Sequence, residues 1–187
     1  MPRLIRAGLL HVQFETIHPY LDGNGRIGRL LITLLLDHWH LLSAPLLYLS
    51  LFFKRHQDEY YHRLAAVRTD GDWEGWTCYF LEAVATIATE ATACAREIFA
   101  LISRDRKRVL AAASSTVMAA RLFELMPDHP IVTSGRAVEL LATTRPTANK
   151  AIRALLEAGI VQETTGKKRD RAYGYVEYLD LLKAGTE

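Results

Sequence analysis

Apolar positions along most of this chain recur at steps of three and four residues, the period of an amphipathic helix. The segment 26–40 is apolar nearly all round, which predicts a central buried helix. Residues 41–53 contain Pro45 and are predicted to be a connection. The helices predicted before residue 127 are Leu4–Ile17, Arg26–His40, Arg55–Arg68, a long helix opened by Asp72 and apolar to Leu101, and Arg106–Met126.

The pattern changes after residue 126. Residues 127–130 contain two prolines and are predicted to be a linker. Two short helices should follow, and then two strands around the basic turn at 166–171. Their predicted bounds are Ser134–Ala142, Pro146–Ala158, Ile160–Thr164 and Ala172–Val176. The sequence therefore predicts a mainly α protein with a first domain at 1–126 and a small second domain at 131–187.

Composition narrows the class of protein. Half of the 187 residues are hydrophobic and 24% are charged, as in ordinary globular proteins. A formal charge of +2 is too small to indicate a nucleic-acid or membrane partner. Cys78 and Cys94 lie in helical patterns, which argues against a disulfide scaffold or a zinc site. Polar residues and Pro45 interrupt the apolar stretch Leu30–Phe53, so we expect no membrane span, and we expect a cytoplasmic protein.

The chemistry is concentrated at residues 18–29, which read His-Pro-Tyr-Leu-Asp-Gly-Asn-Gly-Arg-Ile-Gly-Arg. Gly23 and Gly25 allow a tight turn just before the predicted helix at 26–40. Free N–H groups at a helix N-terminus favour an anion, most naturally phosphate. Arg26 and Arg29 are three residues apart and share one helix face, where two guanidinium groups can hold a polyphosphate.

Two further side chains complete this candidate site. Asp22 adds a carboxylate to a cationic loop, which is how Mg²⁺ is commonly held together with phosphate oxygens. The His18 imidazole can accept a proton from a hydroxyl group near neutral pH. The other histidines His11, His38, His40, His56 and His62 form no ligand pattern and are interpreted as packing or surface residues.

Two alternatives to a phosphate site are compatible with parts of this segment. Gly23, Gly25 and Gly28 also fit a dinucleotide-binding fingerprint, but that motif follows a strand and needs an acid about 20 residues later. Neither condition is met here, since the preceding segment is helical and no carboxylate lies near Ser43. The second alternative is a glycine-rich helix connection whose polar residues only cap and solvate, but the loop carries more charge than capping needs.

The twelve residues 18–29 resemble the signature of Fic proteins, His-Pro-Phe-x-Asp/Glu-Gly-Asn-Gly-Arg-x-x-Arg, with Tyr20 in place of the usual Phe. Most Fic proteins transfer AMP from ATP to a side-chain hydroxyl of a target protein. The resemblance implies His18 as the base, Asp22 as the Mg²⁺ ligand, and Asn24, Arg26 and Arg29 as phosphate donors. The implied ATP and phosphate cradle is Gly23, Asn24, Gly25, Arg26, Ile27, Gly28 and Arg29.

The resemblance also implies details of activity and fold. A Fic branch that transfers phosphate has Ala-Asn-Lys-Arg in the loop and no final Arg, so Gly23, Gly25 and Arg29 favour AMP transfer here. Tyr61 corresponds to an aromatic residue that contacts adenine, although packing of Tyr60 and Tyr61 in the core is the alternative. The implied fold is a Fic-type helical bundle, and the implied partner is a protein with a Ser, Thr or Tyr hydroxyl, including this chain itself.

Only seventeen residues precede His18, whereas Fic proteins normally carry several helices and a β-hairpin flap there. The sequence also lacks the family's inhibitory Ser/Thr-x-x-x-Glu-Gly/Asn pattern. We therefore expect an N-terminally short core without flap or inhibitory helix. A missing helix layer should leave apolar surface exposed, which predicts self-association, for example as a homodimer.

The second predicted domain resembles a winged helix-turn-helix, a module often found after Fic domains. This resemblance would place Pro146–Ala158 in the major groove of DNA and the basic hairpin on phosphates. Lys167, Lys168 and Arg169 are the candidate contacts. The alternative function is thus a DNA-binding regulator with an incomplete Fic nucleotide site, and a purely structural or dimerising role for the domain is also open.

Overall fold

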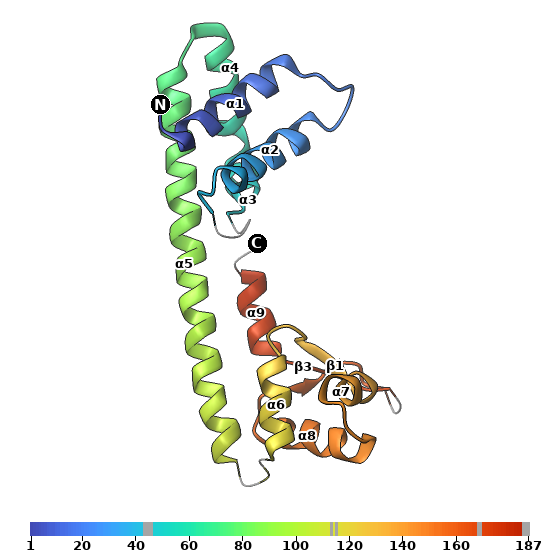
Figure 1. Cartoon of the computed structure of the whole chain (residues 1–187). Coiled ribbons are helices and arrows are strands. Elements are labelled where there is room, and N and C mark those ends of the chain that lie inside the picture. The colour runs from blue at the N-terminus through green and yellow to red at the C-terminus, as the bar shows by residue number, and fades with distance from the viewer. Residues whose placement is uncertain (43–46, 113, 115, 168–169, 185–187) are drawn as a thin grey trace. The chain divides into compact units, whose positions relative to one another are not determined.

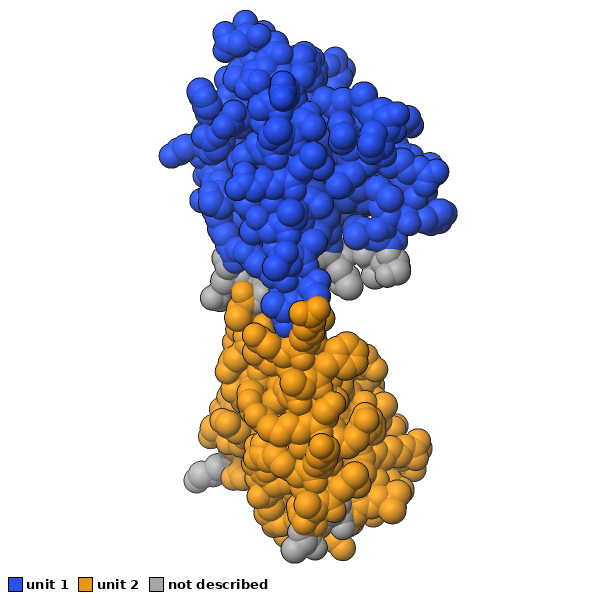
Figure 2. All heavy atoms as spheres, turned by 90° about the vertical axis from the view of Figure 1, so that its left-hand side faces the viewer, with its two compact units in different colours: residues 1–93 blue, residues 94–187 orange. Residues whose placement is uncertain are grey.

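The computed structural model describes residues 1–42, 47–112, 114, 116–167 and 170–184. These residues form a mainly helical fold with one small sheet (Figure 1). The chain divides into two compact units, Met1–Ala93 and Cys94–Glu187, which Figure 2 colours separately. The boundary falls inside helix α5 (Trp73–Ala111). In the described residues, no helix is long and apolar enough to cross a membrane.

Unit 1 is built from helices alone in its described part. Its elements are α1 (Arg3–Ile17), α2 (Asn24–His38), α3 (Leu49–Arg55), α4 (Gln57–Asp70) and the first part of α5. Asp72 caps α5 as predicted, because its Oδ1 accepts a hydrogen bond of 2.9 Å from the Gly75 N–H. The core lies between these helices and is dominated by large apolar and aromatic side chains, among them Ile32, Leu36, Phe53, Trp76 and Phe80.

One glycine of α1 lets two aromatic side chains of α5 pack directly on the α1 backbone. The Trp76 Nε1–H donates to the Gly8 carbonyl over 2.9 Å. A Cβ atom at Gly8 would lie only 2.7 Å from the Phe80 ring, and that ring is fully buried. Glycine thus permits the contact that fixes α1, the helix that ends at His18, on the core of unit 1.

Three predictions for unit 1 need correction. Helix α2 begins at Asn24 rather than Arg26, and it is not buried all round, since Leu30 and Leu34 are each 55% exposed. The segment 49–55, predicted as part of a connection, is helix α3, and the next helix begins at Gln57 rather than Arg55. Pro45, which the prediction treated as a break, lies outside the described residues.

Unit 2 packs short helices on a three-stranded antiparallel sheet. It holds the end of α5 and then α6 (Val117–Leu125), α7 (Ser134–Leu141), α8 (Arg145–Glu157) and α9 (Val176–Ala184). The strands β1 (Ile131–Thr133), β2 (Gln162–Glu163) and β3 (Ala172–Gly174) are arranged in the order β1-β3-β2. Helices α6 and α7 both pack against α8, so these three helices surround the core of this unit.

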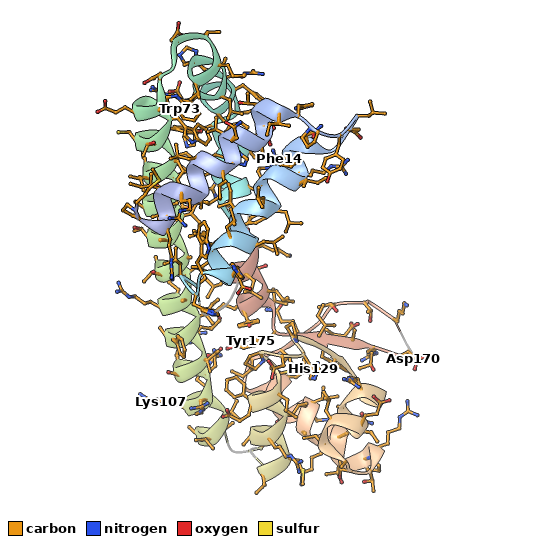
Figure 3. All side chains as sticks on the ribbon, turned by 45° about the horizontal axis from the view of Figure 1, so that its top comes forward. Phe14, Trp73, Lys107, His129, Asp170 and Tyr175 are labelled. Carbon is orange, nitrogen blue, oxygen red and sulfur yellow. The ribbon has the colours of Figure 1, made fainter. Side chains whose placement is uncertain are left out.

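A buried carboxylate fixes the end of α5 within unit 2. Asp105 is 1% exposed and accepts hydrogen bonds from the Tyr175 hydroxyl (2.8 Å), Arg104 Nε (2.8 Å) and Arg108 Nη1 (2.9 Å). Burial by itself would raise the pKa of Asp105, but these three donors together hold it below its ordinary value. Tyr175, labelled in Figure 3, is fully buried and precedes α9.

The predictions for unit 2 were only partly right. Helices α7 and α8 lie within one residue of their predicted bounds, and β2 and β3 are shorter than the predicted strands. The predicted helix at 106–126 is wrong, because α5 continues to Ala111 and α6 begins only after Thr116, whose hydroxyl caps it. Strand β1 and helix α9 were not predicted. Residues 127–130, the predicted linker, lie inside unit 2, whereas the unit boundary is at 93/94.

Candidate functional site

The loop at residues 18–23 joins the end of α1 to the start of α2. His18 closes α1 in a left-handed conformation (φ 51°), and its N–H donates to the Phe14 carbonyl over 2.9 Å. Gly23 has φ 84° at the N-cap of α2. The side chains of His18 and Asp22 are therefore presented from a tightly turned loop, and both residues are exposed.

Asn24 determines the shape of this loop. Its side chain is 2% exposed, and its Nδ2 donates to the Tyr20 carbonyl (2.6 Å) while its Oδ1 accepts from the Tyr20 N–H (2.9 Å). Both groups of the amide are thus engaged on one backbone residue. Asn24 was predicted to donate to phosphate, and the structure instead places its side chain as a brace of the loop.

The start of α2 has the features of an anion site. The first N–H to bond within the helix is that of Ile27, which donates to the Gly23 carbonyl over 3.0 Å, so the N–H groups before it lack an intrahelical acceptor. Among the described residues, no side chain caps this helix. The free N–H groups and the helix dipole therefore leave partial positive charge at the loop.

Arg26 and Asp22 form an ion pair across the loop. Their charged groups are 3.5 Å apart, and their side chains are 77% and 94% exposed. An ion pair so open to solvent contributes little to stability, so a ligand can replace it at low cost. In the described part of the chain, no group of three or more His, Cys, Asp and Glu side chains could hold a metal ion. Asp22 would thus supply one carboxylate to a cation whose other ligands come from phosphate and water.

Most of the predicted site residues line one open hollow of about 270 Å³. Its lining combines the histidine, the acidic, cationic and glycine positions of the loop region and Tyr61 of α4, and consists of His18, Leu21, Asp22, Gly23, Asn24, Gly25, Arg26, Arg29 and Tyr61. Ile27 and Gly28 were predicted in the cradle but are not part of this lining. Gly28 is buried beneath Glu15 and His11 instead.

A second hollow of about 240 Å³ adjoins the first one. Arg29 and Tyr61 line both of them, so the two form neighbouring compartments separated by these side chains. The additional walls come from α3, α4 and the residue before α3, and include Tyr48, Phe53, Lys54, Gln57 and Tyr60. The structure therefore places Tyr61 beside the loop, next to an aromatic-lined space, and its contact with adenine stays a prediction.

A buried histidine of α1, His11, contacts α2 next to the loop and also contacts α4. His11 Nδ1 lies 2.8 Å from the Gly28 carbonyl, and its Nε2 lies 2.9 Å from the Tyr60 hydroxyl. A carbonyl can only accept, so Nδ1 carries the proton and Nε2 accepts from Tyr60. Burial among Phe53, Tyr60 and Trp76 lowers the pKa of His11 to about 4, because the charged form would lose its hydration.

Glu15 lies one helical turn after His11 and is directed at the same part of α2. A Cβ atom at Gly28 would overlap Glu15 Oε1, so the carboxylate packs directly on this glycine. Oε1 is buried and, within the described residues, has no hydrogen-bond partner. Burial raises the pKa of Glu15, and the charges of Arg29 and His18 oppose that shift. The Glu15 carboxylate, whose burial is only partly compensated by positive charge, thus lies near Arg29.

Comparison with known families adds a finding that agrees with this geometry. Residues 1–36 match the model of the Fic/DOC family. The match supports membership of the Fic family. It includes α1, the loop and most of α2, and hence every predicted loop residue of the site, from His18 to Arg29. Tyr61, the second hollow and unit 2 lie beyond the region that matches the Fic/DOC model.

Sequence reasoning missed the residues behind and beside the Fic loop. His11 and Tyr60 were interpreted as packing, and Glu15 was not singled out. The signal was present, because His11 and Glu15 are four residues apart and so share a helix face. Tyr48 was missed because residues 41–53 were predicted as a connection, and Lys54 lies between that connection and the next predicted helix. In unit 2, Lys167 is exposed on the β2–β3 hairpin, whereas Lys168 and Arg169 lie outside the described residues.

Proposed function

We propose that this protein transfers AMP from Mg²⁺-ATP to the hydroxyl of a Ser, Thr or Tyr side chain, in a target protein or in itself. The observation that carries the proposal is the uncapped N-terminus of α2, which lies at the same hollow as the His18 imidazole and the guanidinium groups of Arg26 and Arg29. For a hydroxyl group to attack a phosphate ester, the site needs a base, and it needs groups that stabilise negative charge. Here His18 is the base, and the helix end and two arginines stabilise the charge.

Each side chain has a role in this proposal. His18 accepts the proton of the attacking hydroxyl as oxygen bonds to the α-phosphorus and pyrophosphate leaves. The N–H groups of the loop, Arg26 and Arg29 hold the phosphates, and losing one such donor typically costs about 3 kcal/mol of transition-state stabilisation. Asp22 would release Arg26 and hold Mg²⁺, which neutralises phosphate charge.

The second hollow suits the nucleoside end of ATP. A phosphate chain at the loop places the rest of the nucleotide on one side of Arg29, and Tyr61 lines both spaces there. Tyr61 is 55% exposed, so its ring is available to stack on a base. The match of residues 1–36 to the Fic/DOC family supports the assignment of the loop, and the kept glycines favour AMP over phosphate transfer.

The test is self-modification with ATP labelled at the α-phosphate, in the presence of Mg²⁺, repeated with ATP labelled at the γ-phosphate. We expect α-label on the protein, and a fall of about 10²- to 10⁴-fold in His18→Ala because the base is lost. His38→Ala is the matched control, since His38 is also an exposed histidine of this region but lies at the far end of α2. Its labelling should equal that of the unmodified chain.

The other outcomes would overturn the proposal. Transfer of γ-label alone would mean that ATP binds in the reverse orientation. Equal labelling in His18→Ala would mean that another group is the base. Absence of both labels, with ATP binding intact by calorimetry, would mean a nucleotide site that transfers nothing to this chain.

A further inference from the structure

Helices α7 and α8 of unit 2 form a helix-turn-helix. Helix α7 ends at Leu141 and α8 begins at Arg145, so three residues join them. Ala142 closes α7 with φ 48°, a left-handed conformation that redirects the chain. Two short packed helices with a three-residue turn are the arrangement in which the second helix is presented to an outside surface.

Helix α8 has one buried and one basic face. Ala148, Ala151, Ile152, Ala154 and Leu155 are buried in the core of unit 2. The opposite face carries four exposed polar side chains at positions i, i+4, i+5 and i+8, namely Arg145, Asn149, Lys150 and Arg153. All four lie along less than the length of one short helix, so a single ligand can contact them together.

Within the part of the chain that the structure describes, the cations on this face form no ion pair. Across the described residues, no carboxylate lies within ion-pair distance of Arg145, Lys150 or Arg153. Other arginines of unit 2 are paired, since Arg104 and Arg106 contact Glu177 and Glu124 at 2.6 and 2.7 Å. The exposed face of α8 therefore carries three cations that are not engaged in an ion pair with a described carboxylate.

This face also borders a hollow. Its volume is about 850 Å³, and its lining joins the polar face of α8 to Ser114 and Thr116 at the start of α6. On α8 the lining extends from Arg145 to Glu157. Outside this hollow, unit 2 also carries Lys167 and Arg171 between β2 and β3, and Arg171 Nε donates to the Lys167 carbonyl over 2.9 Å.

We infer that unit 2 binds duplex DNA through the exposed face of α8, with Arg145, Asn149 and Arg153 directed at base edges in the major groove. The major groove admits an α-helix, and arginine and asparagine are the side chains that pair with guanine and adenine there. Lys150 contacts the phosphate backbone, and Lys167 and Arg171 contact it from the hairpin. This activity lies beyond AMP transfer and uses none of the Fic loop.

The test measures fluorescence anisotropy of a labelled 30-base-pair duplex of mixed sequence with the full chain. We expect a Kd of about 10⁻⁴ to 10⁻⁶ M near physiological salt, and weaker binding as salt rises. Lys150→Gln should weaken binding by about five- to tenfold and lower the salt slope by about 1, because one phosphate contact is lost. Asn149→Ala should flatten the preference among duplexes selected from a random pool, with little effect on the salt slope.

Arg121→Gln is the matched control. Arg121 is exposed on α6 of the same unit and is absent from the lining of the hollow. Its substitution therefore removes one positive charge from unit 2 at a place outside the proposed DNA-binding face. Its affinity should change less than twofold, and circular dichroism should show that both variants are folded. Equal losses in the two variants would mean unspecific attraction to charge and overturn the inference. The inference would also be overturned if no duplex binding were seen at 50 mM salt, or if single-stranded RNA bound more tightly through the same residues.

Discussion

His11 and Asp105 are both buried ionisable side chains, and their surroundings lead to opposite charge states. Burial disfavours the charged form of His11, and the hydrogen bond to the Gly28 carbonyl offsets this only in part, so His11 stays neutral with a lowered pKa. Asp105 contacts two guanidinium groups and a phenol, which compensate its negative charge. The partners, rather than the degree of burial, decide the outcome.

The low pKa of His11 predicts a dependence of stability on pH. In the unfolded chain His11 binds a proton near pH 6.5, whereas in the folded chain it does so only near pH 4. The unfolded state therefore binds more protons in this window, and stability is lost as pH falls from 6.5 to 4, by about 3 kcal/mol in total. Urea unfolding followed by tryptophan fluorescence at pH 7.5, 5.5 and 4.5 measures this loss.

The fluorescence reports unit 1 alone, because all three tryptophans lie within residues 1–93. His11→Gln is the control, and its stability should be lower at pH 7.5 but should fall less steeply toward pH 4.5. Glu15 has the opposite dependence on pH, since its pKa is raised, but it is present in both proteins and cancels in the comparison. Equal slopes in the two proteins would contradict the assignment to His11.

Single residues of the loop could be predicted from sequence because their chemistry is local. His18, Asp22, Gly23 and Arg26 lie within one short segment, so their meeting at one hollow requires no long-range folding. The role of Asn24 could not be predicted, since phosphate binding and loop bracing use the same amide. The contact of His11 with Tyr60 spans 49 residues and depends on how α1 packs against α4.

At the scale of elements, α2 shows that apolar periodicity alone does not identify the buried face of a helix. Its sequence is apolar on several faces, yet its buried residues are only Asn24, Gly28, Ile32 and Leu36, one row at steps of four. Periodicity cannot separate buried from exposed positions where every position is apolar. The structure shows which apolar positions of α2 are buried and which are exposed. Substitution by alanine should lower the stability more at the buried positions than at the exposed ones.

Leu36 and Leu34 provide a matched pair on α2. Leu36 is 1% exposed and Leu34 is 55% exposed. Leu36→Ala should lower the free energy of unfolding of unit 1 by about 2–5 kcal/mol, because it removes packed methyl groups and leaves a cavity. Leu34→Ala should change it by less than about 0.5 kcal/mol, as is usual for surface positions. Urea unfolding followed by tryptophan fluorescence measures both, and a large loss at Leu34 would show that this face is covered in solution.

The length of an element governed whether it could be predicted. Helices α1, α7 and α8 have several turns of clear periodicity or strong end signals, and they lie close to their predicted bounds. Strand β1 has three residues and helix α3 has seven, too few for a period to be recognised. The sequence from Leu101 to Ala111 contains no proline or glycine to end a helix, so the continuation of α5 to Ala111 could have been predicted from this absence.

At the scale of the whole chain, two separate cores predict two unfolding transitions. Tyr175 lies in the core of unit 2 and donates to Asp105. Tyr175→Phe leaves the carboxylate one donor short and should destabilise unit 2 by about 1–3 kcal/mol. The transition seen by tryptophan fluorescence should not move, whereas circular dichroism at 222 nm should show an earlier loss of helix. A shift of both by the same amount would mean that the units unfold together.

The boundary between the units could not be predicted from composition. Prolines at 127 and 130 indicated a linker, but α6 before them packs on α7 and α8 after them, and their contacts belong to one core. The boundary at 93/94 lies within a regular helix and carries no local signal. Only the distribution of packing contacts reveals it.

A boundary inside α5 also restricts how this chain can have evolved by exchange of parts. A recombination event at the prolines would transmit β1 to α9 without α6, and it would separate Leu122, Phe123 and Met126 from the apolar residues of α7 and α8 in the same core. An inherited copy of unit 2 that folds must bring the end of α5 with it, including Asp105 for Tyr175. Gene fusions that preserve this unit should therefore join within a helix rather than at a loop.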